Sequence, residues 1–182
     1  MKVRETGFSG LVVVIPSVYP DSRGYFFESF NKSAFEKEGI FYSPVQDNES
    51  KSSKGVLRGL HYQLNPMAQA KLIRVISGNI YDVAVDLRKD SATFGKWFGI
   101  ELNSESKEQL FIPKGFAHGF SVLSETAVIM YKCDNLYSPA HERGINLNDP
   151  YLSIDWKTGS ITPVISEKDL KNPGFWDAEK NF

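Results

Sequence analysis

Short runs of β-branched and aromatic residues, interrupted every few positions by Gly, Pro, Asn or Ser, fill most of this chain. Such runs are typical of β-strands, and the turn-forming residues between them mark the strand ends. We predict strands at 11–15, 25–30, 55–63, 71–77, 79–87, 96–102, 109–112, 117–123 and 127–133. Gly78 is expected to close a tight hairpin, because glycine adopts the positive φ that such turns need. So many short strands favour an antiparallel sandwich or barrel.

Two short helices are predicted beside these strands. Asn31 can cap the first, Phe30 and Phe35 occupy the positions of a hydrophobic staple, and Gly39 can end it. A second helical turn is expected to begin at Ser166, where the sequence fits a loose capping-box pattern.

The composition fits a single domain formed by residues 1–182, with 41% hydrophobic and 13% aromatic residues to build its core. The 21 Lys and Arg nearly balance the 22 Asp and Glu, so no basic excess points to nucleic acid or an anionic membrane. The single Cys133 excludes an intrachain disulfide. The apolar run at 11–15 is too short for a membrane span, which takes about 20 residues. We therefore expect a cytoplasmic protein.

Two acidic residues, Asp82 and Asp86, alternate with apolar residues in the strand predicted at 79–87. Strict alternation places both on one face of that strand. This face meets solvent in most sheets, but it lines the cavity in a barrel that holds a polar ligand. Periodicity does not choose between the two.

The chain has three histidines, His61, His118 and His141, and two of them lie in informative surroundings. Alternation would place Arg58 and His61 on opposite faces of their strand, but a β-bulge at Gly59 would turn both to one side. An isolated strand histidine is more often structural or exposed than catalytic.

His118 ends a Pro-x-Gly-x-x-His pattern, which resembles the second signature segment of cupin barrels. A metal-binding cupin also needs a His-x-His pair and a glutamate in its first segment. Here His61 is followed by Tyr62 and Gln63, so the sequence argues against a metal site.

Eight strings spread over residues 10 to 170 resemble the dTDP-4-dehydrorhamnose 3,5-epimerase family. They are DSRGYFFE (21–28), QDN (46–48), KGVLRGLHYQ (54–63), QAK (69–71), YDVAVDLR (81–88), IPKGFAHGF (112–120), YKC (131–133) and SEKD (166–169). The resemblance implies a cupin-like jelly roll, a homodimer, no cofactor, and a thymidine-diphosphate 4-keto-6-deoxy sugar whose C3 and C5 are inverted. Protons beside a ketone are weakly acidic, so this reaction needs a positioned base and a stabilised enolate oxygen.

The same resemblance assigns four catalytic roles. His61 matches the base and Asp169 the carboxylate that orients it, whereas Lys71 matches the cation near the enolate and Tyr131 the residue that returns a proton. Taken alone, each has a plainer interpretation: Asp169 caps a helix, Lys71 is solvated, and Tyr131 is a core or rim aromatic.

Further residues match substrate-binding positions of the family. Arginine suits a diphosphate because its planar fork bonds phosphate oxygens bidentately. Leu136 replaces one of two tyrosines that the family often carries there, and the second, Tyr137, is kept. The matched residues are Arg23 and Arg58 at the diphosphate, Tyr19 and Tyr137 at the thymine, Glu28, Gln46 and Asn48 around the nucleotide and sugar, and His118 near the keto-sugar.

Three alternatives to a 3,5-epimerase of dTDP-rhamnose synthesis stay open. A single-centre epimerase would use the same base and cation at C3 or C5 alone. A catalytically silent nucleotide-sugar-binding cupin is disfavoured because His61 and Asp169 are both present. A metal-dependent cupin is disfavoured because its signature is missing.

Overall fold

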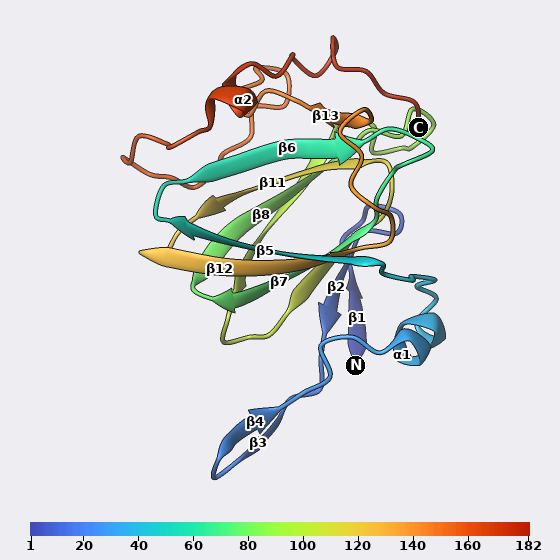
Figure 1. Ribbon diagram of the computed structural model, residues 1–182, viewed down its shortest axis with the longest axis vertical. Helices are drawn as coiled ribbons and strands as arrows, with labels where there is room; N and C mark the ends of the chain where they lie inside the picture. The colour runs from blue at the N-terminus through green and yellow to red at the C-terminus, as the bar shows by residue number, and fades with distance from the viewer.

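Two antiparallel sheets pack face to face in the computed structural model, which describes residues 1–182 (Figure 1). The six-stranded sheet has the order β1 (Lys2–Glu5), β2 (Val12–Ile15), β10 (Gln109–Ile112), β7 (Lys71–Ser77), β12 (Thr126–Cys133) and β5 (Gln46–Ser53). The five-stranded sheet has the order β13 (Glu142–Gly144), β6 (Leu57–Gln63), β11 (Phe116–Val122), β8 (Asn79–Asp86) and β9 (Trp97–Asn103). The predicted all-β, cupin-like jelly roll is confirmed.

The core has three parts, set by the alternation of side chains along the strands. The first fills the space between the sheets and includes Ile73, Leu102 and Phe120. The second lies on the outer face of the five-stranded sheet, where the C-terminal segment covers it with Ile145, Trp156 and other side chains. The third lies between the six-stranded sheet and α1 (Lys32–Lys37).

Most predicted strands are confirmed to within two residues, but two predictions are wrong. The strand predicted at 25–30 ends at Phe26, because the chain turns there toward α1. The predicted hairpin at Gly78 does not exist: β7 and β8 lie in different sheets, so this turn carries the chain across the barrel. Gly78 does have the expected positive φ of 86°.

Both predicted helices are present. The Asn31 side chain accepts a hydrogen bond from the backbone N–H of Ala34 at 3.2 Å, and the rings of Phe30 and Phe35 pack 5.0 Å apart. The second helix, α2 (Glu167–Leu170), is capped by Ser166 and lies beside β6. Neither helix is long and apolar enough to cross a membrane.

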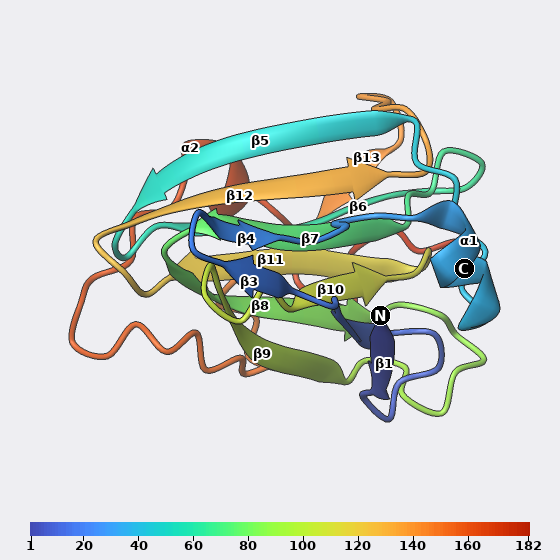
Figure 2. The ribbon, with the colours of Figure 1, turned by 90° about the horizontal axis from the view of Figure 1, so that it is seen from below.

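A separate hairpin of β3 (Tyr19–Asp21) and β4 (Gly24–Phe26) projects away from the barrel (Figure 1), and the view from below shows it in front of the barrel strands (Figure 2). Its residues are exposed, among them the large side chains of Tyr19, Tyr25 and Phe26. We call this hairpin the arm.

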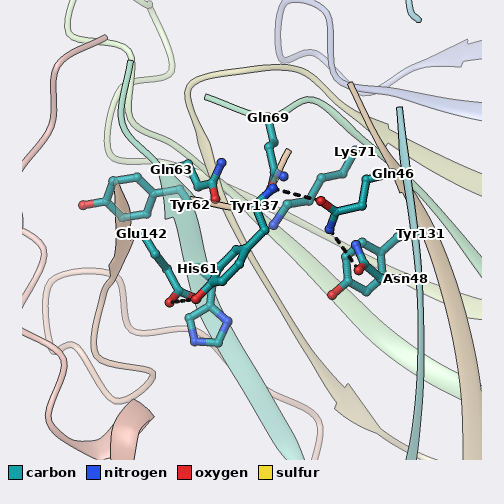
Figure 3. A pocket seen from close by; sticks show the side chains of 10 residues that line it. All are labelled: Gln46, Asn48, His61, Tyr62, Gln63, Gln69, Lys71, Tyr131, Tyr137 and Glu142. Atoms are coloured by element: carbon teal, nitrogen blue, oxygen red, sulfur yellow. Dashed lines mark hydrogen bonds between the residues drawn. The ribbon is translucent and has the colours of Figure 1, made fainter. Parts of the chain in front are cut away.

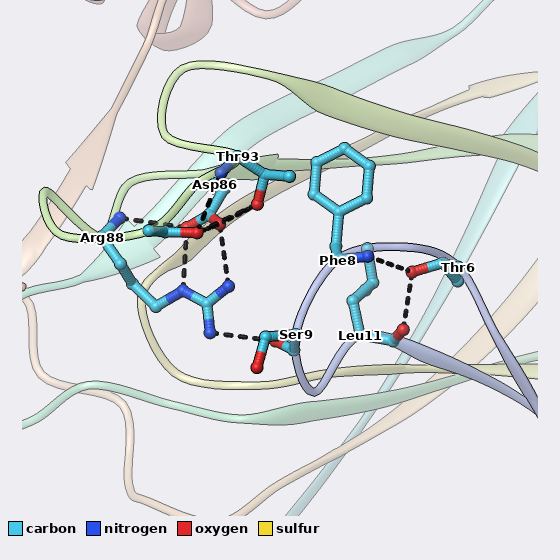
Figure 4. Close-up of polar contacts among 8 residues, drawn as sticks. Thr6, Phe8, Ser9, Leu11, Asp86, Arg88 and Thr93 are labelled. Atoms are coloured by element: carbon cyan, nitrogen blue, oxygen red, sulfur yellow. Dashed lines mark hydrogen bonds and ion pairs between the residues drawn. The ribbon is translucent and has the colours of Figure 1, made fainter.

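The acidic face of β8 turns inward, so the solvent-facing interpretation is wrong for both acids. Asp86 is fully buried at one end of the barrel, where it accepts hydrogen bonds from Arg88, Ser91 and Thr93 (Figure 4). Burial alone would raise the pKa of Asp86, but these hydrogen bonds outweigh it and lower the pKa. Arg88 also donates to the Ser9 carbonyl at 3.0 Å, which ties the N-terminal loop to the barrel.

Candidate active site

A cavity with two lobes opens between the sheets, and His61, Lys71 and Tyr131 line both lobes. The first lobe is also lined by Gln46, Asn48, Tyr62, Gln63, Gln69, Tyr137 and Glu142 (Figure 3). The second is also lined by Ser50, Val56, Leu57, Arg58, Gly59, His118, Gly119, Phe120, Val164, Ile165, Ser166, Lys168 and Asp169.

His61 reaches the cavity from β6 because this strand is irregular at Gly59. The pairing of β6 with β11 shifts register between the partners of His61 and Arg58, and both residues line the second lobe. The predicted bulge is therefore confirmed. A side chain at Gly59 would collide with the backbone of Gly119, which explains the glycine.

Asp169 approaches His61 from α2 on the C-terminal segment. Nε2 of His61 lies 2.6 Å from Oδ1 of Asp169, a distance typical of a short charge-assisted hydrogen bond. Burial alone would raise the pKa of Asp169, but the hydrogen bond and charge of His61, supported by Ser166, lower it. When the imidazole is neutral, the ionised carboxylate accepts from Nε2–H and Nδ1 of His61 carries the lone pair.

Lys71 and Tyr131 lie on the opposite wall, on neighbouring strands β7 and β12 of the six-stranded sheet. The Lys71 ammonium is 6.0 Å from the centre of the Tyr131 ring. Burial lowers the pKa of Lys71, although Cys133, Asp82 and Glu142 oppose this shift. Burial also raises the pKa of Tyr131, so its hydroxyl keeps its proton at neutral pH.

A second histidine–carboxylate pair lies next to the first. His118 on β11 is the register partner of His61, and its Nε2 lies 3.0 Å from each oxygen of Asp82 on β8. Asp82 has no exposed side-chain surface. The alternation of β8 placed Asp82 on a candidate cavity face, but nothing in the sequence linked it to His118.

Five of the predicted binding residues line the cavity: His118, described above, and Gln46, Asn48, Arg58 and Tyr137. Gln46 donates to Asn48 at 3.0 Å and accepts from the backbone N–H of Tyr137 at 2.8 Å. Arg58 donates to the Ser52 hydroxyl at 2.9 Å. These contacts link β5 to the loop before β13 and to β6, so they hold the polar rim of the cavity together.

Arg23, Glu28 and Tyr19 lie outside the cavity of their own chain. Arg23 and Tyr19 are on the arm, and Glu28 follows it. The Arg23 side chain is 87% exposed and is paired with Asp21 at 2.6 Å. Within one chain, these three residues therefore do not meet the other predicted site residues.

Two charged residues that line the cavity, Glu142 and Lys168, escaped the sequence-based prediction. Glu142 on β13 accepts hydrogen bonds from the Tyr137 hydroxyl at 2.8 Å and from Lys168 at 2.5 Å. Lys168 adjoins Asp169 within the family-like string at 166–169, which could have indicated it. Glu142 lies in no such string. No cluster of three or more His, Cys, Asp or Glu side chains has the arrangement of a metal site.

Comparison with known proteins places the chain in a family. The sequence model described as dTDP-4-dehydrorhamnose 3,5-epimerase matches residues 5–177. An enzyme of that name from Shigella flexneri is 51% identical over 180 residues, 98% of each chain. The crystal structure of another, from Elizabethkingia anophelis, superposes with a TM-score of 0.93 at 51% identity and 97% coverage of both chains.

A Legionella pneumophila epimerase, crystallised with dTDP-4-keto-L-rhamnose, has a TM-score of 0.90 and 46% identity, covering 95% of this chain and 92% of its own. Agreement of sequence over nearly the full length, together with agreement of fold, confirms the resemblance found in the eight strings. The chain belongs to the dTDP-4-dehydrorhamnose 3,5-epimerase family.

Proposed function

We propose that residues 1–182 act as one cupin-like epimerase domain, which converts dTDP-4-keto-6-deoxyglucose into dTDP-4-keto-L-rhamnose by inverting C3 and C5. The protein is an isomerase that removes and returns protons beside a ketone, without metal or redox cofactor. One observation carries the proposal: the base candidate His61 and the acid candidate Tyr131 lie on opposite walls of one cavity. Inversion needs proton removal on one face of the sugar and return on the other.

His61 is the base in this proposal. Its Nε2–H is held by Asp169 at 2.6 Å, which leaves the Nδ1 lone pair to accept the proton from the carbon. The carboxylate then stabilises the imidazolium that forms. Because Asp169 is almost buried and His61 is 31% exposed, the carboxylate lies behind the imidazole and leaves part of the ring open to substrate.

Lys71 stabilises the enolate oxygen. When the proton leaves carbon, negative charge develops on the former ketone oxygen, and a cation in a partly desolvated site stabilises it strongly. Lys71 has no anionic hydrogen-bond partner, so its ammonium is free for this oxygen. Tyr131 then returns a proton to carbon from the other face, and its raised pKa keeps that proton available.

We further propose that the protein is a homodimer in which the arm of one subunit reaches the nucleotide site of the other. Arg23 and Tyr19 match nucleotide-binding positions, yet they lie on an arm that their own chain does not cover (Figure 1). Arg58 would bind the diphosphate from the cavity wall. The single buried Cys133 suits a reducing cytoplasm, where we propose that the enzyme works.

Mixed dimers test this arrangement. His61→Ala and Arg23→Ala each damage one part of the site, and each homodimer should be impaired. If the arm reaches the partner's site, the subunit with Arg23→Ala keeps its own His61 and receives Arg23 from the other subunit. One site of the mixed dimer is then intact, and mixing the two variants restores activity. No gain on mixing, with dimers and subunit exchange verified by native mass spectrometry, would contradict the proposal.

Product analysis tests the reaction. The protein is incubated with dTDP-4-keto-6-deoxyglucose, the ketone is reduced with borohydride, and the released sugars are identified. Sugars inverted at both C3 and C5 are expected, including L-rhamnose. Inversion at C3 or C5 alone would establish the single-centre alternative instead. Unchanged substrate together with tight dTDP binding would identify a silent binder.

A further inference from the structure

Gly144 on β13 lies directly beside His61, because the two residues are register partners in the pairing of β13 with β6. Cross-strand partners point to the same face of a sheet, so a side chain at position 144 would stand next to the His61 imidazole. The φ of Gly144 is not in the left-handed region. The backbone conformation therefore does not explain why this position is a glycine.

The side chain of Asn172 fills the space beside Gly144. A Cβ atom added to Gly144 would lie 2.5 Å from Cγ and 2.6 Å from Oδ1 of Asn172, and closer still to Nδ2. Carbon atoms in contact are normally about 3.5–4.0 Å apart, so a methyl group and this amide cannot share the space. Nδ2 is completely buried and has no hydrogen-bond partner, so packing rather than hydrogen bonding holds the amide there.

Asn172 belongs to the turn that carries Asp169. Its backbone N–H donates to the Asp169 carbonyl at 3.3 Å. The next residue, Pro173, accepts from the backbone N–H of Asn146 at 2.8 Å, two residues beyond Gly144. The turn is thus fastened to the chain that follows β13 on one side, and it presents the Asp169 carboxylate to His61 on the other.

We propose that Gly144 and Asn172 are positioning residues, which set the distance between Asp169 and His61 by packing the Asn172 amide into the space that Gly144 leaves open. A methyl group at 144 displaces the amide, and the turn moves with it. The 2.6 Å contact between Asp169 and His61 then lengthens. The proposal rests on the epimerase function proposed above for its kinetic consequence, but its structural consequence can be measured without turnover.

The test is a compensating pair of substitutions. Gly144→Ala should lower kcat about 10- to 100-fold, because a shift of about 1 Å in a catalytic pair has an effect of that size. KM and dTDP affinity should stay within about twofold, since the nucleotide contacts are unchanged. The downfield proton NMR resonance of the short His61–Asp169 hydrogen bond should disappear. Gly144→Ala combined with Asn172→Ala makes room for the methyl group and should restore both kcat and the resonance.

Lys171→Ala is the matched control, because it changes an exposed neighbour in the same turn and should leave both readouts unaltered. If Gly144→Ala does not fold, Asn172→Gln overfills the same space from the turn alone and should also lower kcat. An unchanged kcat and resonance in the folded variants would overturn the proposal, as would a double variant no better than Gly144→Ala. A wild-type protein that shows the resonance but no turnover would instead refute the epimerase function.

Discussion

The two histidine–carboxylate pairs of the cavity have the same chemistry but different surroundings. His61 and His118 are register partners on adjacent strands, and each binds one carboxylate through Nε2. The His118 side chain is 9% exposed and its partner Asp82 is fully buried, whereas the His61 side chain is 31% exposed. Asp82 lies in the same sheet as His118, but Asp169 comes from the C-terminal segment outside both sheets.

This difference in exposure bears on which pair is suited to exchange protons with a substrate. The His118 pair is enclosed, with both carboxylate oxygens at 3.0 Å from one nitrogen, so it stiffens the floor of the cavity. The His61 pair has a single shorter contact and an exposed ring. A base must reach the proton that it removes, so the greater exposure of His61 supports the proposal that His61 is the base and that His118 contributes to binding.

The largest expected effect is that of His61→Ala. Removing the base should lower kcat by about 10²–10⁴-fold, the usual contribution of a general base. Binding of dTDP, measured by calorimetry, should be nearly unchanged. Arg58→Ala is the control, because it should weaken dTDP binding, which His61→Ala leaves nearly unchanged. Loss of a charge-assisted contact costs about 1.5–3 kcal/mol of nucleotide binding. If the His61 variant retained full activity, the assignment would be wrong.

Asp169→Asn should have the next largest effect. The amide keeps the shape of the carboxylate but cannot stabilise an imidazolium, so kcat should fall about 100-fold with little change in KM. Steady-state kinetics check this. A change confined to KM would mean that Asp169 contributes to substrate binding and not to the base.

Asp82→Asn should affect the reaction less and the fold more. The enclosed pair loses a buried charge-assisted contact, so the free energy of unfolding should fall by about 1–3 kcal/mol. The loss of kcat should stay below about tenfold, because the His61 pair is intact. Urea denaturation measures the free energy of unfolding, and steady-state kinetics measure kcat, for Asp82→Asn and Asp169→Asn side by side. Equal losses of kcat in both variants would contradict the proposal that the two histidine–carboxylate pairs have different roles.

The smallest effect concerns stability in acid. The pKa of Asp169 is lowered in the folded protein, so its contribution to stability is complete above the ordinary carboxyl pKa of about 3.9 and is lost as the pH falls through the lowered value. Asp169→Asn should therefore flatten the fall of Tm below about pH 4. Thermal melts at several pH values measure this slope, and parallel slopes for wild type and variant would contradict it.

The sequence was sufficient to predict the regular parts of the fold. Apolar alternation located the central strands, and the Asn31 cap with the Phe30–Phe35 staple located α1. The sequence pattern did not predict β5. The inward residues of this strand are polar because they line the cavity, so the strand lacks the usual apolar alternation. The sequence pattern also failed at Gly78, because a turn residue does not reveal whether the next strand joins the same sheet.

For the site, family-like strings indicated His61, Lys71, Tyr131 and Asp169, and the fold brings all four to one cavity. Gly59 gave a physical reason for the inward turn of His61. Two features of the site could be found only in the three-dimensional structure. The Asp82–His118 pair joins residues 36 positions apart, and the exposure of the arm separates Arg23 from the cavity of its own chain.

Proton NMR of dTDP-4-keto-6-deoxyglucose in deuterated water, with wild type and His61→Ala in parallel, tests the central claim most directly. Wild type should introduce deuterium at both C3 and C5, because each inversion takes its new proton from a group that exchanges with solvent. His61→Ala should introduce none while still binding dTDP. Exchange that persists in the variant, or its absence in wild type, would contradict the account.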